Sequence, residues 1–207
     1  MNPGLAEGPD GTLRCWWGAG PDEGYRDYHD REWGRPETSD TRLFEKIVLE
    51  GFQAGLSWIT ILRKRPRFRE VFGGFDIGTV AGFGPDDVDR LLGDAGIIRH
   101  RGKIEAAISN AAAASETIEE FGSLADYVWP SAPADAPAPR HPEDIPAITD
   151  VSTALSKDLK RRGWRFVGPT TVYAFMQAMG LVNDHLAGCM VRDEVEALRR
   201  PVLAEYH

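Results

Sequence analysis

Apolar residues recur along most of the chain at intervals of three and four positions, a spacing that places them on one face of an α-helix. Strands need a strict alternation of apolar and polar residues, and runs of that kind are scarce. The pattern therefore predicts an all-α fold. Helices are expected to begin after Ser39-Asp40, at Asp86-Asp87, after Gly102, at Ser152 or Thr153, at Thr170, and at Asn183 or Asp184, the last one carrying His185 and Cys189. Gly51 and Gly55 are expected to interrupt the first of them.

The helical pattern stops at both ends of the chain and once inside it. Residues 1–12 are rich in Gly, Pro and acidic side chains and are expected to form a flexible N-terminal tail, and 193–207 are assigned to a C-terminal tail. Six prolines between Pro130 and Pro146 exclude a helix or a central strand, so 130–147 is expected to be a surface loop. Residues 13–192 then form a single helical domain, which suits a chain of 207 residues.

The composition is that of an ordinary globular protein, with 42% hydrophobic and 27% charged residues. No apolar run approaches the roughly 20 residues that a membrane span needs. The first residues have neither the basic start nor the apolar stretch of an export signal. We therefore expect a cytoplasmic monomer that does not bind membranes, and in that compartment the two cysteines stay reduced.

Basic side chains are concentrated in three runs, although 32 acidic residues outnumber 24 basic ones and give a net charge of −8. A negative balance by itself counts against a nucleic-acid partner. A single basic run is typical of a solvated helix end. Three runs that contain only one acidic residue, Asp158, instead favour a surface that binds phosphates. The runs are residues 63–69, 99–103 and 157–165.

Both cysteines have a histidine nearby in the sequence. His185 and Cys189 are four positions apart, and Cys15 precedes His29 by fourteen. Each residue alone has an ordinary alternative, a core thiol or a hydrogen-bonded imidazole. Together they make a Cys2His2 set, the closed ligand set of structural zinc sites. Because four protein ligands leave no place for an activated water, the predicted Zn²⁺ stabilises the fold and links the N- and C-terminal segments.

Aromatic residues gather near the first pair of these ligands. Four of the six tryptophans lie within the first 58 residues, and each could simply belong to the core. As a group they could instead wall a pocket for a flat, cationic heterocycle. Glu50 lies at the border between an apolar and a polar helix face, next to Trp58 in helical projection. It could be idle and half solvated, or it could face that pocket and attract a positive substrate.

A helix, a glycine-bounded turn and a second helix are predicted over residues 92–104. Such a turn directs backbone N–H groups and a helix N-terminus outward, which suits a phosphate. Arg99, Arg101 and Lys103 add positive charge. An ordinary connection between two helices needs the same glycines, so this pattern is only moderately specific.

Several long motifs, in one order, resemble those of the 3-methyladenine DNA glycosylase I family of constitutive alkylation-repair enzymes. The likeness runs from about Arg14 to Cys189 and omits only the two tails and the proline-rich loop. The motifs are YHDREWG at 28–34, LEGFQAGLSWI at 49–59, DAGIIRHRGKI at 94–104, FVG at 166–168 and GLVNDH at 180–185.

The resemblance implies a helix-hairpin-helix glycosylase fold with a bound zinc and assigns roles to particular residues. It implies that the zinc ligands are Cys15, His29, His185 and Cys189. It implies that Glu50, Tyr28 and Trp58 contact the base that is extruded from the duplex, with Trp33 and Trp17 as further walls of the pocket. It implies that Arg99, Arg101, Gly102 and Lys103 hold the DNA backbone and that Gly55 and Leu56 lie near the gap that the base leaves.

The implied activity is monofunctional. The enzyme would flip the alkylated base out of double-stranded DNA, hydrolyse its N-glycosidic bond and leave free 3-methyladenine and an abasic site. Two alternatives stay open. Lys103 occupies the place of the Schiff-base lysine in related bifunctional enzymes, although Phe121 stands where their aspartate is expected. A zinc-stabilised module that senses damaged DNA without catalysis would need neither Glu50 nor the aromatic cluster.

Overall fold

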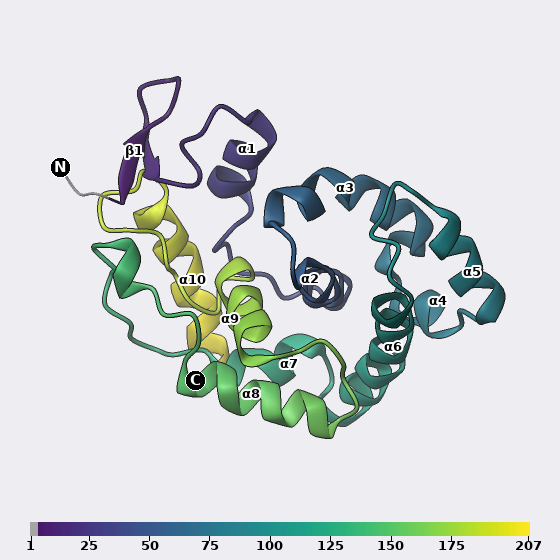
Figure 1. The fold of residues 1–207 in the computed structure, drawn as a ribbon. Coiled ribbons are helices and arrows are strands. Elements are labelled where there is room, and N and C mark those ends of the chain that lie inside the picture. The colour runs from purple at the N-terminus through teal and green to yellow at the C-terminus, as the bar shows by residue number, and fades with distance from the viewer. Residues whose placement is uncertain (1–3) are drawn as a thin grey trace.

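The computed structural model describes residues 4–207 and is built mostly of helices, as predicted (Figure 1). The first half contains α1 (Glu23–Arg31), α2 (Asp40–Gln53), α3 (Trp58–Val71), α4 (Ile77–Ala81) and α5 (Pro85–Gly93). The second half contains α6 (Arg101–Phe121), α7 (Leu124–Val128), α8 (Asp150–Arg161), α9 (Pro169–Ala178) and α10 (Arg192–Tyr206). Among the described helices, none is long and apolar enough to cross a bilayer.

Helix α2 is the centre of the fold. It is seen down its axis near the middle of Figure 1, with α3 to α6 on one side and α8 to α10 on the other. Every residue from Leu43 to Phe52 is buried, including three charged side chains. The expected break at Gly51 is wrong: the helix continues to Gln53, and Gly51 instead permits close packing, since a Cβ there would lie 3.2 Å from Cβ of Phe166. Gly55, with φ +84°, lies in the turn that follows the helix.

Both predicted tails are corrected by the structure. Residues 5–7 form strand β1 (Leu5–Glu7), which pairs antiparallel with β2 (Leu13–Cys15), and only residues 1–3 lie outside the described part. At the other end, α10 covers nearly all of 193–207 and buries Val195 and Leu203. Its apolar stripe is short and is interrupted in sequence by Pro201, so periodicity gave no clear helix signal.

The segment that carries His185 and Cys189 is not the helix that the sequence predicted. Residues 181–191 form turns whose amides bond to distant carbonyls: the N–H of Ala187 donates to Pro139 and that of Met190 to Leu13. These tertiary hydrogen bonds replace the local ones of a helix. The proline-rich residues 130–147 contain no α-helix or strand, as expected, but they include the end of the 3-10 helix Trp129–Ser131 and the 3-10 helix Pro142–Asp144. They supply one of those carbonyls.

Candidate functional site

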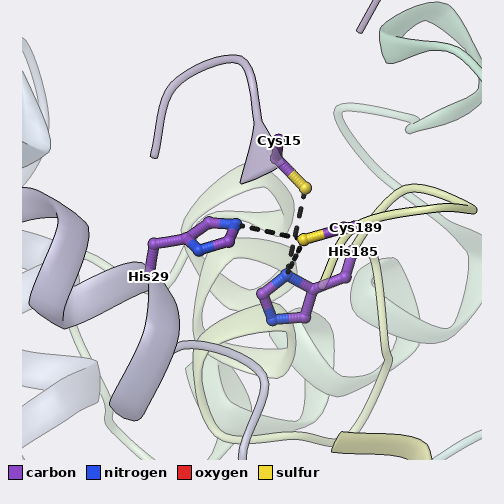
Figure 2. A group of neighbouring side chains, drawn as sticks. All are labelled: Cys15, His29, His185 and Cys189. Atoms are coloured by element: carbon purple, nitrogen blue, oxygen red, sulfur yellow. Dashed lines mark hydrogen bonds between the residues drawn. The ribbon is translucent and has the colours of Figure 1, made fainter. Parts of the chain in front are cut away.

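Cys15, His29, His185 and Cys189 come together in one buried cluster, although they come from β2, α1 and the turns before α10 (Figure 2). The ligand atoms all lie within 4.8 Å of one another. Sγ of Cys189 is 3.6 Å from Nε2 of His29 and 3.7 Å from Nδ1 of His185, and Sγ of Cys15 is 3.9 Å from that same Nδ1. The structure therefore joins all four residues that the sequence proposed as ligands.

The outer nitrogen of each imidazole has a partner that fixes which nitrogen faces the cluster. Nδ1–H of His29 donates to a carboxylate oxygen of Asp30 at 2.8 Å, and Nε2–H of His185 donates to the carbonyl of Trp33 at 3.0 Å. Because a carboxylate and a carbonyl can only accept, the free lone pair of each ring points at the two thiols. Asp30 is itself held by the buried guanidinium of Arg14, at 2.8 to 3.1 Å.

The cluster could hold a metal ion, and three of its distances can be compared with those around a tetrahedral zinc ion. Bonds of about 2.3 Å to sulfur and about 2.1 Å to nitrogen separate a sulfur ligand from a nitrogen ligand by about 3.6 Å. The three sulfur–nitrogen distances above agree with that value to within a few tenths of an ångström. The hydrogen bond with Cys15 is the main cause that lowers the pKa of Cys189, which favours the thiolate form that a metal ligand needs. The carboxylate of Asp30 and the carbonyl of Trp33 are the kinds of acceptor that metal-binding histidines usually have at their other ring nitrogen.

A second polar cluster lies on the other side of α1, around the side chain of Lys46. Its ammonium is 2.8 Å from Oε1 of Glu50, donates to Oη of Tyr28 at 2.7 Å, and lies 3.3 Å from the ring centroid of Trp58. All four side chains are more than nine-tenths buried. We call these four residues the aromatic slot. A carboxylate, a phenol oxygen and an indole face thus converge on one positive charge.

The aromatic slot lies between two cavities. Tyr28, Lys46 and Trp58 line a cavity of about 70 Å³, and Glu50 lines another of about 210 Å³ together with Gly55 and Leu56 in the turn after α2. Those two linings share no described residue, and the ion pair between Lys46 and Glu50 joins a residue of one to a residue of the other.

The electrostatics of the slot follow from burial. Burial lowers the pKa of Lys46 to about 8, although Glu50 opposes that effect. Burial, followed by the charge of Glu50, raises the pKa of Tyr28 well above its ordinary value, so the phenol stays protonated. The buried Nε1–H of Trp58 has no hydrogen-bond acceptor among the described residues. The slot therefore lacks an acceptor at this position.

The structure places the two other predicted wall residues next to the cysteine–histidine cluster. The ring of Trp33 lies 4.6 Å from that of His185 and stacks at 6.5 Å on His29. Trp17 packs 4.9 Å from His29 and 6.3 Å from Tyr28. Neither residue lines the cavities of the aromatic slot. They connect the two clusters instead.

The glycine-bounded turn joins α5 to α6, as the sequence predicted. The imidazole of His100 accepts from the N–H of Lys103 and caps α6, and the side chain of Arg99 is exposed. Arg101 is bound to Asp89 at 2.8 Å. The amides of Arg101 and Gly102 lie in the first turn of α6, where no intrahelical acceptor exists.

Lys103, for which a phosphate contact is predicted, has hydrogen-bond partners within the protein. Its ammonium is buried and donates to the carbonyls of Phe52 and Ala54, at 2.9 and 2.6 Å, so it caps the C-terminus of α2 rather than facing solvent. The position inside a basic run gave no sign of this, because only the fold brings α6 against the end of α2.

The three basic runs are less free than they look in sequence. In the run 63–69, Arg63 binds Asp22 and Arg65 binds Glu32, and Arg67 and Arg69 likewise pair with distant acidic residues. In the other two runs, Arg101 pairs with Asp89 and Arg162 with Glu120, whereas Arg161 pairs with Asp158 of its own run. In the described part of the chain, Arg99 and Arg165 are exposed and pair with no acidic side chain.

Sequence reasoning missed three residues of the two clusters. Arg14 and Asp30 orient His29, and Asp30 directly follows it in the sequence, which was a usable signal. The third residue is Lys46, which no sequence motif assigned to the pocket. Its position one turn before Glu50 is the spacing of a helical ion pair, which could have indicated the contact.

Fold and site together define a class: a helical protein with a closed metal-type centre beside a buried slot that holds a flat aromatic face, a carboxylate and a positive charge. Residues 16–193 match the methyladenine glycosylase family. The chain is 51% identical over 178 residues to DNA-3-methyladenine glycosylase 1 of Escherichia coli (strain K12), which covers 85% of this chain and 95% of that protein.

Other relatives agree. The DNA-3-methyladenine glycosylase of Haemophilus influenzae is 49% identical over 182 residues, which covers 86% of this chain and 97% of that one. A crystal structure of 3-methyladenine DNA glycosylase I matches with a TM-score of 0.81 at 51% identity, covering 86% of this chain and 98% of the other. A structure of the Staphylococcus aureus enzyme, which describes 3-methyladenine recognition, has a TM-score of 0.81 at 36% identity, covering 84% and 94%. This chain belongs to the methyladenine glycosylase family.

Proposed function

We propose that this protein is a monofunctional DNA glycosylase that hydrolyses the N-glycosidic bond of 3-methyladenine in alkylated double-stranded DNA, releases the free base and leaves an abasic site. The observation that carries the proposal is the convergence of Tyr28, Trp58 and Glu50 on one buried positive charge. A relative has been solved in complex with 3-methyladenine. Alkylation of a ring nitrogen makes adenine cationic, and the slot is built for a flat cation.

The residues of the slot supply recognition and electrostatic stabilisation. The face of Trp58 and the ring of Tyr28 favour a cationic purine over a neutral one by about 0.5 to 2 kcal/mol per contact. The unpaired Nε1–H of Trp58 can donate to an acceptor of the base. Glu50 pairs with the positive charge while the base is bound and stabilises the positive charge that develops on the sugar.

The chemical step follows from the charge of the substrate. The electron pair of the C1′–N bond moves to the cationic base, which leaves as neutral 3-methyladenine, and the positive charge passes to the sugar. Water then adds to C1′ and loses a proton. Since the leaving group already carries the charge, the protein has mainly to find, flip and hold the base, and flipping a poorly paired damaged base costs less than flipping an intact one.

The turn after α2 and the hairpin between α5 and α6 suit the duplex. Leu56 is 42% exposed at the rim of the cavity that Glu50 lines, where an apolar side chain could fill the gap left by the base. The N-terminus of α6 and the exposed Arg99 would bind backbone phosphates in the manner of a helix-hairpin-helix element.

Cys15, His29, His185 and Cys189 would hold a structural Zn²⁺. When bound, the ion would have all four positions filled by protein and would therefore stabilise the fold without activating water.

The structure disfavours a lyase that uses Lys103. Its ammonium is held by two carbonyls at the end of α2, whereas a Schiff-base lysine needs a free amine at the sugar. The acidic residues nearest to the expected aspartate, Glu119 and Glu120, lie at the far end of α6, about 25 Å along the helix axis.

The test is chromatography of the bases released from methylated duplex DNA. We expect the wild-type protein to release 3-methyladenine, and Glu50→Gln to lower the rate by about 10²- to 10³-fold while duplex binding persists. Glu116→Gln, an exposed residue of α6, is the matched control and should behave as wild type. Duplex binding without base release by the wild type would instead indicate the non-catalytic sensor. A borohydride-trapped adduct that Lys103→Ala abolishes would indicate the lyase.

A further inference from the structure

Lys46 contacts the same three side chains that the proposed base would use. Its ammonium lies on the face of Trp58, forms an ion pair with Glu50 and donates a hydrogen bond to the phenol oxygen of Tyr28. It belongs to α2, one turn before Glu50, so the backbone of both residues is fixed by the same buried helix. The ammonium is therefore a built-in ligand of the slot and not a surface charge that happens to lie near it.

A cationic base and this ammonium cannot occupy the slot together. Two positive charges a few ångströms apart in a buried site repel strongly, and one carboxylate is available to neutralise them there. Arg65 adds to this repulsion, because its guanidinium carbon lies 6.0 Å from the ring centroid of Tyr28, although Glu32 holds it at 2.6 Å. The entering base must displace the ammonium, and a neutral base must do so as well, because the ammonium already lies against the Trp58 ring and the Tyr28 oxygen that the base would contact.

We propose that Lys46 is an internal competitor for the base slot, an inference that rests on the function proposed above. In the free enzyme its ammonium fills the slot and neutralises Glu50, and an extruded base binds only by driving it out. Any flipped base must displace this ammonium before it can bind. An undamaged base has no positive charge that could pair with Glu50 in its place, so it competes less well.

The base has one interaction that the ammonium lacks. An ammonium only donates hydrogen bonds, so it leaves the buried Nε1–H of Trp58 without an acceptor, whereas a purine carries ring-nitrogen acceptors. After bond cleavage the base is neutral and loses its charge pairing with Glu50. Lys46 can then return to the slot, which assists release of the product.

The experiment compares binding of free 3-methyladenine to the wild type, to Lys46→Met and to Lys160→Met by calorimetry. Methionine keeps an unbranched side chain that is one atom shorter and removes the charge, and Lys160 is an exposed lysine on α8. We expect Lys46→Met to bind the base at least tenfold more tightly than the wild type, and Lys160→Met to equal the wild type. Equal affinity of all three proteins would overturn the inference.

A second measurement uses the wild type alone, in case the variant does not fold. Amine acylation followed by mass spectrometry reports how exposed each lysine is. We expect the modification of Lys46 to rise at least several-fold when 3-methyladenine is added and that of Lys160 to stay constant. Continued protection of Lys46 with the base bound would show that the ammonium remains in place. If no protein binds 3-methyladenine, the proposed function fails; if the wild type binds it with Lys46 still protected, only this inference fails.

Discussion

Helix α1 lies between two buried polar clusters and contributes one of two adjacent residues, His29 and Tyr28, to each. His29 points into the cysteine–histidine cluster, where each imidazole has an acceptor for its outer N–H and a thiol for its inner nitrogen. Tyr28 points into the aromatic slot, where Trp58 has an unpaired N–H and a lysine is held at a cost of desolvation. In the cysteine–histidine cluster each imidazole nitrogen has a partner within the protein, whereas the aromatic slot contains a donor without an acceptor.

The difference separates a structural site from a functional one. A set of four ligands with ordered outer partners can hold an ion permanently and leaves no position for a substrate. An unpaired donor and a buried charge next to a cavity lower the stability of the free protein. A ligand that pairs with them on entering the slot removes that destabilisation. Three experiments test this distinction.

The largest expected effect is on the cysteine–histidine cluster. Because metal binding contributes to the folding free energy, removal of zinc by a chelator should lower the free energy of unfolding by about 4 kcal/mol or more. Cys189→Ala should have the same effect without a chelator. Denaturant unfolding followed by tryptophan fluorescence measures both.

The control for this experiment is Met190→Ala, because that neighbouring side chain is 49% exposed and should matter little. If the unfolding curves were identical with and without chelator and elemental analysis found no zinc in the protein, the cysteine–histidine cluster would not be a structural metal site.

The next effect concerns the charge held in the slot. The pKa of Lys46 is lowered to about 8 by burial, whereas an unfolded lysine has a pKa of about 10.4. Between these pH values the unfolded chain binds a proton that the folded protein does not, so the stability of the wild type rises with pH in this window. Relative to Lys46→Met, the gain should be on the order of 3 kcal/mol from pH 8 to 10.4.

Unfolding at a series of pH values measures this difference, and subtraction of the variant removes the titration of other groups. The groups that face Lys46 are Glu50, Tyr28, Glu32 and Arg65. If the stability of the wild type and of Lys46→Met changed in parallel with pH, the slot would not lower the pKa of this lysine.

The smallest effect tests how the slot is supported. Lys103→Met removes two hydrogen bonds from an ammonium to the last carbonyls of α2 and should cost about 2 kcal/mol in urea unfolding. The slope of DNA affinity against salt should stay unchanged, because Lys103 makes no phosphate contact in this arrangement.

Arg99→Ala is the matched comparison and should show the reverse behaviour. The exposed side chain should leave stability within about 0.5 kcal/mol, and its loss should reduce the salt slope by about 1 if it binds one phosphate. If Lys103→Met kept full stability and showed a reduced salt slope, the result would support the phosphate contact that the sequence predicted.

Local patterns predicted much of the helical framework. The helices at Asp40, Pro85, Arg101 and Pro169 begin within one or two residues of their expected starts, since caps, glycines and apolar periodicity are local features. The C-terminal helix was missed because Pro201 interrupts its stripe. The helix expected around His185 was wrong because amides there bond to carbonyls that are distant in sequence.

The same division applies to the two clusters. The sequence by itself determined which residue types could bind a metal and a flat cation, because two cysteines, two nearby histidines, a helical carboxylate and a concentration of tryptophans are chemistry that requires no coordinates. Tertiary structure alone decided which basic residues are free and which are paired, and it placed Lys46 in the slot and Lys103 beneath α2. A charged group pairs with whatever packs against it, and many of these partners come from distant parts of the chain, although Lys46 with Glu50 and Arg161 with Asp158 are local pairs.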